Sequence, residues 1–232
     1  MKIRKTNFQP SGFLINPVYI QIIQQHLVWL LKQRRSVEAA QDRIGVNASI
    51  VLFSAIYLEG FFEDILCSFV WSTYDRRRNA KSQAIYDIEK LASLDSYAEA
   101  FERMGVPLGN FLSDADSEDL NIIFHLRNLL AHGQRDSYYI MLSDGYMPKV
   151  IKGGYYEKID KFFVKRRVIK RNSHPQGNDF SVIFSDPVAN WIYKKVKDLC
   201  LTVLKHVEWG IEMHSQSQNF RLKMIKNCIV KL

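Results

Sequence analysis

The sequence predicts a mainly α-helical protein, an antiparallel helical bundle with a small β-hairpin insertion before the last long helix. Apolar residues recur three and four apart over most of 15–135 and 186–215, as on the buried face of helices. Between these regions, over 137–185, the pattern changes to short β-branched and aromatic runs. No long linker divides the chain, so we expect a single domain over 1–232 with a basic tail at 216–232.

Local sequence signals mark the ends of the first two helices. Asn16 followed by Pro17 predicts a helix start, because proline suits the first helical position, and this helix is expected to end before Gly45. Asn47 is expected to cap a second helix over 48–74.

The remaining helices follow from similar signals. Residues 82–104 predict one broken helix or two short ones, and the stretch 105–110, with its glycines and proline, stops them. The next helix is expected to start near Ser117, where two acids follow, and to stop at Gly133. Asp186, followed by proline, predicts the start of the last long helix.

The insertion is predicted to be β-structure. Its segments either alternate in polarity or are rich in β-branched and aromatic residues, which favours a small antiparallel sheet or a pair of hairpins. The predicted strands are 138–142, 146–151, 162–169 and 180–184.

Composition and charge favour a negatively charged partner. The chain of 232 residues is 47% hydrophobic and has a formal net charge of +8. Such a charge favours nucleic acid first and an anionic membrane surface second. The most hydrophobic stretch, 48–71, carries Glu59, Glu63 and Asp64, which are costly in a bilayer. We therefore interpret it as a buried helix and expect no membrane partner.

Cysteine and histidine spacing predicts neither a disulfide framework nor a metal site, and we expect no cofactor. The three cysteines, Cys67, Cys200 and Cys228, lack paired-ligand spacing. No apolar signal-peptide core occurs over 1–10, so a cytoplasmic protein is expected. Four histidines are interpreted as ordinary side chains: His26, His174, His206 and His214.

The most informative stretch is 124–133, at the end of a predicted helix. Arg127, Asn128 and His132 combine a fixed cation, an amide and a group that titrates near neutral pH. These groups are suited to holding a phosphate and moving a proton. His125, Asn128 and His132 are spaced three and four apart on one stripe of the helix. The alternative is a surface helix end whose histidine interacts with terminal carbonyls.

The chain around this motif resembles the HEPN superfamily, all-α domains associated with nucleic acids. Its ribonuclease members carry Arg-x4-6-His, commonly with Asn directly after the Arg, and Arg127, Asn128 and His132 match that pattern. The segment 48–63 also looks like the acid-bearing core helix that precedes the motif helix in this family. The resemblance covers roughly 15–135.

The resemblance implies a metal-independent endoribonuclease of the toxin or antiphage-defence kind. In such chemistry an RNA 2′-hydroxyl attacks its adjacent phosphate, Arg127 stabilises the developing charge and His132 moves a proton. Asn128 fixes the imidazole or holds a phosphate oxygen. Similar families dimerise across their motif helices, so a homodimer with a composite cleft is expected, together with an antitoxin or regulatory protein. His125 is a supporting candidate for a second imidazole.

One position departs from a branch of the family. Where nucleotidyltransferase-regulated HEPN toxins carry a modified tyrosine, this chain has Gln134, which argues against that mode of regulation. Two alternative functions stay open beside the enzyme. One is a non-catalytic HEPN-like RNA-binding or sensor module, and the other is a helical adaptor whose basic face recruits a protein.

Two further features have functional and structural interpretations. Glu59 is a candidate for supporting the site, but a buried acid needs a partner, and we favour a structural ion pair with Arg127 or Arg43. The segment 149–171 interleaves basic residues with tyrosine and phenylalanine. It is either a solvated hairpin edge or an RNA-binding arm. The residues expected to contact RNA are Lys165, Arg166, Arg167, Lys170 and Arg171.

Overall fold

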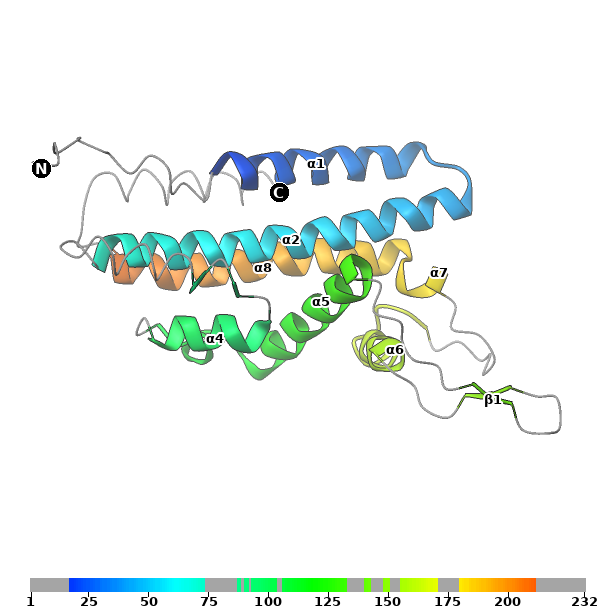
Figure 1. The fold of residues 1–232 in the computed structure, drawn as a ribbon. Helices are drawn as coiled ribbons and strands as arrows, with labels where there is room; N and C mark the ends of the chain where they lie inside the picture. The colour runs from blue at the N-terminus through cyan, green and yellow to red at the C-terminus, as the bar shows by residue number, and fades with distance from the viewer. Residues whose placement is uncertain are drawn as a thin grey trace, which may run out of the picture.

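The computed structural model of the chain describes residues 17–73, 87–88, 90–91, 93–103, 106–132, 140–142, 148–150, 155–170 and 180–211. The protein is mainly α-helical, as the sequence predicts (Figure 1). The helices are α1 (Pro17–Ser36), α2 (Ala40–Thr73), α4 (Leu94–Arg103), α5 (Asp114–His132), α6 (Tyr155–Lys165), α7 (Phe180–Ile183) and α8 (Asp186–Ile211). A 3₁₀ helix, η1 (Leu108–Asn110), and two strands, β1 (Ile140–Leu142) and β2 (Pro148–Val150), complete the described elements.

The core lies around α2, which packs against α1, α8 and α5 (Figure 1). Leu58 and Phe61 of α2 are fully buried, as are Leu27 of α1 and Ile192 of α8. Burial of each such side chain contributes about 1.5–3 kcal/mol relative to exposure. The motif helix α5 is held between this core and α6, which covers its other side.

The predicted start of the second helix is wrong. α2 begins at Ala40 and not after Asn47, which lies inside the helix and is buried. Asn47 Nδ2 donates a hydrogen bond to Asp186 Oδ1 at 2.8 Å, and its Oδ1 accepts one from Arg34 at 3.4 Å. These contacts tie α2 to α8 and α1. The preference of asparagine for a helix cap is therefore outweighed by tertiary hydrogen bonds.

The ends of the motif helix follow local chemistry. α5 begins at Asp114, earlier than the predicted Ser117, because Ser113 and Asp116 form a reciprocal cap. The Ser113 amide donates to Asp116 Oδ2 at 3.1 Å, and the Asp116 amide donates to Ser113 Oγ at 3.2 Å. The helix ends at His132, directly before Gly133, as predicted.

The insertion is partly helical. β1 and β2 pair antiparallel, with Ile140 opposite Val150. The strands predicted over 162–169 and 180–184 are wrong, because α6 and α7 occupy much of these segments. Ile159, Phe162 and Phe163 of α6 are all buried. Their helical spacing places them on one packed face, and this packing overrides the strand propensity of the aromatic residues.

Several predicted features lie outside the described residues. They are Asn16, Gly133, Gln134, Arg171, His174, His214, Cys228 and the tail 216–232.

Helix α6 ends with a left-handed residue that is not glycine. The Val168 amide donates to the Phe163 carbonyl at 2.9 Å, and the Arg167 amide donates to the Val164 carbonyl at 3.0 Å. This pair of hydrogen bonds is the Schellman arrangement, which needs a positive φ at the residue after the cap. Arg167 has a φ of 57°, so its side chain is accommodated at a steric cost.

Replacing Arg167 by glycine is expected to raise the free energy of unfolding by about 1 kcal/mol, because glycine lacks the Cβ that crowds this conformation. Urea unfolding would measure the change. Arg167→Ala is the matched control, since it removes the charge and keeps the Cβ. An equal gain in the alanine variant would attribute the effect to charge and contradict a backbone origin.

Candidate functional site

Arg127 of α5 is fixed by Glu59 of α2. Arg127 Nε donates to Glu59 Oε2 at 3.0 Å, and Arg127 Nη2 donates to Glu59 Oε1. Both side chains are 13% exposed, so water screens the pair little. Of the two arginines that the sequence offered as partners for Glu59, the structure selects Arg127. Arg43 lies instead 3.9 Å from Asp186.

The arginine also holds its neighbour in the motif. Arg127 Nη1 donates to Asn128 Oδ1 at 2.6 Å, which fixes the amide oxygen. The amide N–H groups of Asn128 therefore point away from the guanidinium. Glu59, Arg127 and Asn128 form a continuous chain, which we call the arginine chain.

A tyrosine borders the arginine chain. Tyr97 Oη donates to Glu63 Oε1 at 3.0 Å. Burial is the main cause that raises the pKa of Tyr97, and the charges of Glu63 and Glu59 raise it further, while Arg127 opposes them. The phenol therefore stays protonated and acts as a hydrogen-bond donor.

His132 is the last residue of α5, one helical turn after Asn128. Its side chain lies outside the part of the chain that is described. The backbone thus brings Arg127, Asn128 and His132 to one end of the helix, and the catalytic role of all three stays a prediction.

His125 faces a different side of α5 from Arg127. It lines a groove of about 510 Å³ between α5 and α6, whereas Arg127 contacts α2. The pKa of His125 is lowered, first by burial and second by the charge of Lys158, so the imidazole is uncharged near neutral pH. His125 therefore does not face Glu59 and Arg127, although its helical spacing places it beside Asn128. The groove is lined by Glu118, Asn121, Ile122, His125, Lys158, Lys161, Phe162 and Lys165.

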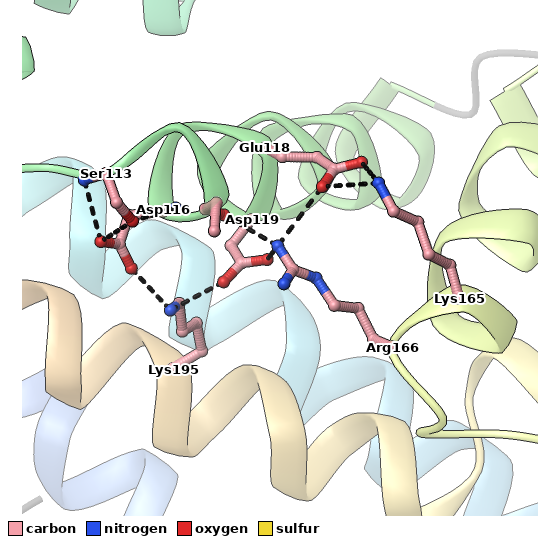
Figure 2. Close-up of polar contacts among 8 residues, drawn as sticks. Ser113, Asp116, Glu118, Asp119, Lys165, Arg166 and Lys195 are labelled. Carbon is pink, nitrogen blue, oxygen red and sulfur yellow. Dashed lines mark hydrogen bonds and ion pairs between the residues drawn. The ribbon is translucent and has the colours of Figure 1, made fainter.

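Two of the predicted RNA-binding residues have carboxylate partners within the protein (Figure 2). Lys165 Nζ donates to Glu118 at 2.8 Å and 3.1 Å, and this hydrogen bond lowers the pKa of Glu118. Arg166 lies 2.6 Å from Asp119, whose side chain is 4% exposed. A phosphate would have to compete with these acids for both cations.

One of these acids, Asp119, also connects α5 to α8, together with Asp116. Lys195 Nζ lies 2.7 Å from Asp116 and 2.7 Å from Asp119. Figure 2 shows Lys195 between these two carboxylates. Burial alone would lower the pKa of Lys195, but the two carboxylates outweigh it and raise the pKa. We call this set of ion pairs the clamp, because Asp119 joins Lys195 of α8 and Arg166 at the end of α6 to one point on α5. The clamp gives Arg166 a structural role that the sequence pattern did not indicate.

The other predicted RNA contacts have a different environment. Arg167 and Lys170 are exposed, in the turn that follows α6. Within 149–171, residues 155–170 form a helix and a turn, so the hairpin-edge interpretation is wrong for this part, whereas 149–150 belong to strand β2. Binding of RNA by these residues stays a prediction.

No family model matches the chain, and no curated protein and no solved structure matches it. In the part of the chain that the structure describes, no group of three or more His, Cys, Asp and Glu side chains is arranged to hold a metal ion. Among these same residues, no helix is both long enough and apolar enough to cross a bilayer. Cys67 and Cys200 are buried and form no disulfide, and burial raises the pKa of Cys200.

Proposed function

We propose that the protein is a metal-independent endoribonuclease with Arg127, Asn128 and His132 as its motif. The observation that carries the proposal is the arginine chain, which holds a cation and an amide in fixed positions one turn before His132. Donors that are already oriented stabilise a developing negative charge without reorganising during the reaction.

The proposed reaction divides its tasks among these groups. The 2′-oxygen forms a bond to phosphorus and loses its proton to an imidazole, while the bond to the 5′-oxygen breaks and that oxygen receives a proton. Asn128 donates to a non-bridging oxygen, and Arg127 supplies positive charge behind it. The products are a 2′,3′-cyclic phosphate end and a 5′-hydroxyl end.

Cleavage of a mixed RNA pool in a chelator, followed by analysis of the new ends, tests this activity. Cyclic phosphate ends support the enzyme. RNA binding without cleavage would support the RNA-binding or sensor module instead. That alternative is favoured by one observation, because Glu59 and Asn128 already engage the guanidinium of Arg127. If the protein neither binds nor cleaves RNA, the helical adaptor that recruits a protein is the remaining alternative.

A homodimer completes the proposed site. Each chain contributes one His132, whereas the reaction uses one group to remove a proton and another to supply one. A two-fold axis at the motif helices brings the two copies together. By the HEPN resemblance, such an enzyme acts in the cytoplasm as a toxin or in antiphage defence and has an antitoxin or regulatory protein as partner.

Light scattering is expected to give the mass of two chains at the concentration of the cleavage assay. Adding excess His132→Ala chains to wild-type chains should reduce cleavage well below the level expected from dilution alone, because most wild-type chains would then sit in mixed dimers. A monomer with full activity would refute the composite site.

A further inference from the structure

Helix α1 carries two exposed apolar side chains on one side. α1 lies at the edge of the bundle, with α2 between it and α5 (Figure 1). Its buried residues, among them Ile23, Leu27 and Leu30, face the core. Away from the core, Ile22 is 55% exposed and Trp29 is 50% exposed. These two residues are seven apart, which is two helical turns and about 10 Å along the axis, so they project from the same side of the helix.

The indole of Trp29 is held in position by its neighbours. It stacks on the ring of His26 in the preceding turn of α1, with 5.4 Å between the ring centroids and 22° between the planes. His26 in turn packs edge-on against Phe53 of α2, with the ring centroids 4.4 Å apart. A side chain that is already oriented loses less conformational entropy when a partner binds, and tryptophan is enriched among the residues that dominate the binding energy of interfaces. Trp29 is therefore a preorganised anchor.

Positive charge borders the two apolar anchors. Lys32 and Arg35 of α1 are exposed, and within the described part of the chain neither of them pairs with a carboxylate. The sequence of α1 contains no acid, and the first acids after it, Glu38 and Asp42, lie beyond the end of the helix. We call the surface that these exposed side chains form along one side of α1 the tryptophan face, and it consists of Ile22, Gln25, Trp29 and Lys32.

The spacing and chemistry of the tryptophan face fit a helix from another protein. An amphipathic helix presents apolar residues at i, i+3 or i+4, and i+7, which is the two-turn spacing between Ile22 and Trp29. Acidic side chains beside that apolar stripe can pair with Lys32. A nucleic acid could stack a base on the indole but would leave the aliphatic Ile22 without an apolar partner. A second copy of the same face would oppose two helices that carry cations and no acid.

We propose that the tryptophan face docks an acidic amphipathic helix of a partner protein. Ile22 and Trp29 pack between the apolar side chains of that helix, and Lys32 and Arg35 bind its carboxylates at the rim. Charge complementarity sets the chemistry of the partner, since the rim is basic and the whole chain has a net charge of +8. The inference does not depend on ribonuclease activity, because the face lies on α1 and the proposed motif lies on α5.

The test selects helical peptides on the full chain from a displayed library. Each peptide spans about five helical turns, about 18 residues, with leucines fixed along one stripe and the other positions random among glutamate, glutamine, lysine and alanine. The enriched peptides are expected to be acidic. Trp29→Ala should weaken their binding about 30-fold, which is the effect of losing a dominant interface residue. The double variant Lys32→Gln and Arg35→Gln should weaken it about fivefold, as expected for charges at a rim.

Two control variants and one further variant of the face make the test specific. Leu201→Ala removes a leucine of α8 that is 36% exposed, and the double variant Lys194→Gln and Lys205→Gln removes two exposed lysines of the same helix. Both controls should bind the enriched peptides as the natural chain does. Ile22→Ala should weaken binding by itself, so the result does not depend on Trp29→Ala alone, and thermal unfolding of each variant shows that it is folded.

The proposal is overturned if no enriched peptide depends on Trp29, or if those that do are basic or uncharged. Evidence for another occupant of the face would overturn it as well. A smaller mass of Trp29→Ala in light scattering would assign the face to a second copy of the chain. Weaker binding of single-stranded RNA by Trp29→Ala, in proteins that also carry His132→Ala to prevent cleavage, would assign the indole to RNA. Loss of binding to vesicles of anionic phospholipid in the same variant would assign the face to a membrane surface.

Discussion

His132→Ala is expected to slow RNA cleavage by about 100-fold or more, while RNA affinity and thermal stability stay near those of the natural chain. The size of the effect follows from general acid–base catalysis, in which one positioned group contributes about 10²–10⁴-fold. Single-turnover cleavage at saturating protein measures the chemical step apart from binding. Equal rates for the variant and the natural chain would remove His132 from the proposed mechanism.

Variants of two other histidines show whether a loss of cleavage is specific to His132. His206 is exposed on α8 and stacks on Phe111 at 5.0 Å, so His206→Ala is the matched control and should cleave normally. His125→Ala tests whether the histidine in the groove takes part in catalysis. A loss of the chemical step comparable to that of His132→Ala would identify His125 as the second imidazole and make the dimer unnecessary for chemistry.

The fold could be predicted where the signal is local. Pro17, Asp186 and the end of α5 were found because proline, an acid at a helix start and a following glycine act within one helical turn. The helix cap predicted at Asn47 is wrong because the partners of this side chain, Arg34 and Asp186, are distant in sequence.

The candidate site was predictable to a similar degree. The pairing of Glu59 with an arginine follows from the cost of burying a lone carboxylate, and the structure adds which arginine it is. The groove could not be foreseen, because the sequence pattern suggested that Phe162 lies in a strand. Only the helix α6 brings Lys158 and Lys161 opposite His125.

Removing Arg127 alone is expected to destabilise the protein strongly. Arg127→Met removes the cation that neutralises Glu59, whose side chain is 13% exposed, and breaking a buried pair of this kind costs about 3–5 kcal/mol of unfolding free energy. The exposed pair of Arg103 and Glu99 on α4 is the matched control, with side chains 81% and 66% exposed. Arg103→Met should cost less than about 1 kcal/mol, and urea unfolding measures both.

Replacing Glu59 and Arg127 together separates their effect on stability from their effect on RNA cleavage. The double variant Glu59→Leu and Arg127→Met removes the charges together, so it should recover most of the stability that Arg127→Met loses, because apolar side chains can fill the place of a buried pair. If Arg127 supplies charge to the reaction, the recovered protein should still cleave RNA at least about 100-fold more slowly than the natural chain. A stable double variant that cleaves normally would assign Arg127 to the fold alone and leave Asn128 and His132 to carry the chemistry.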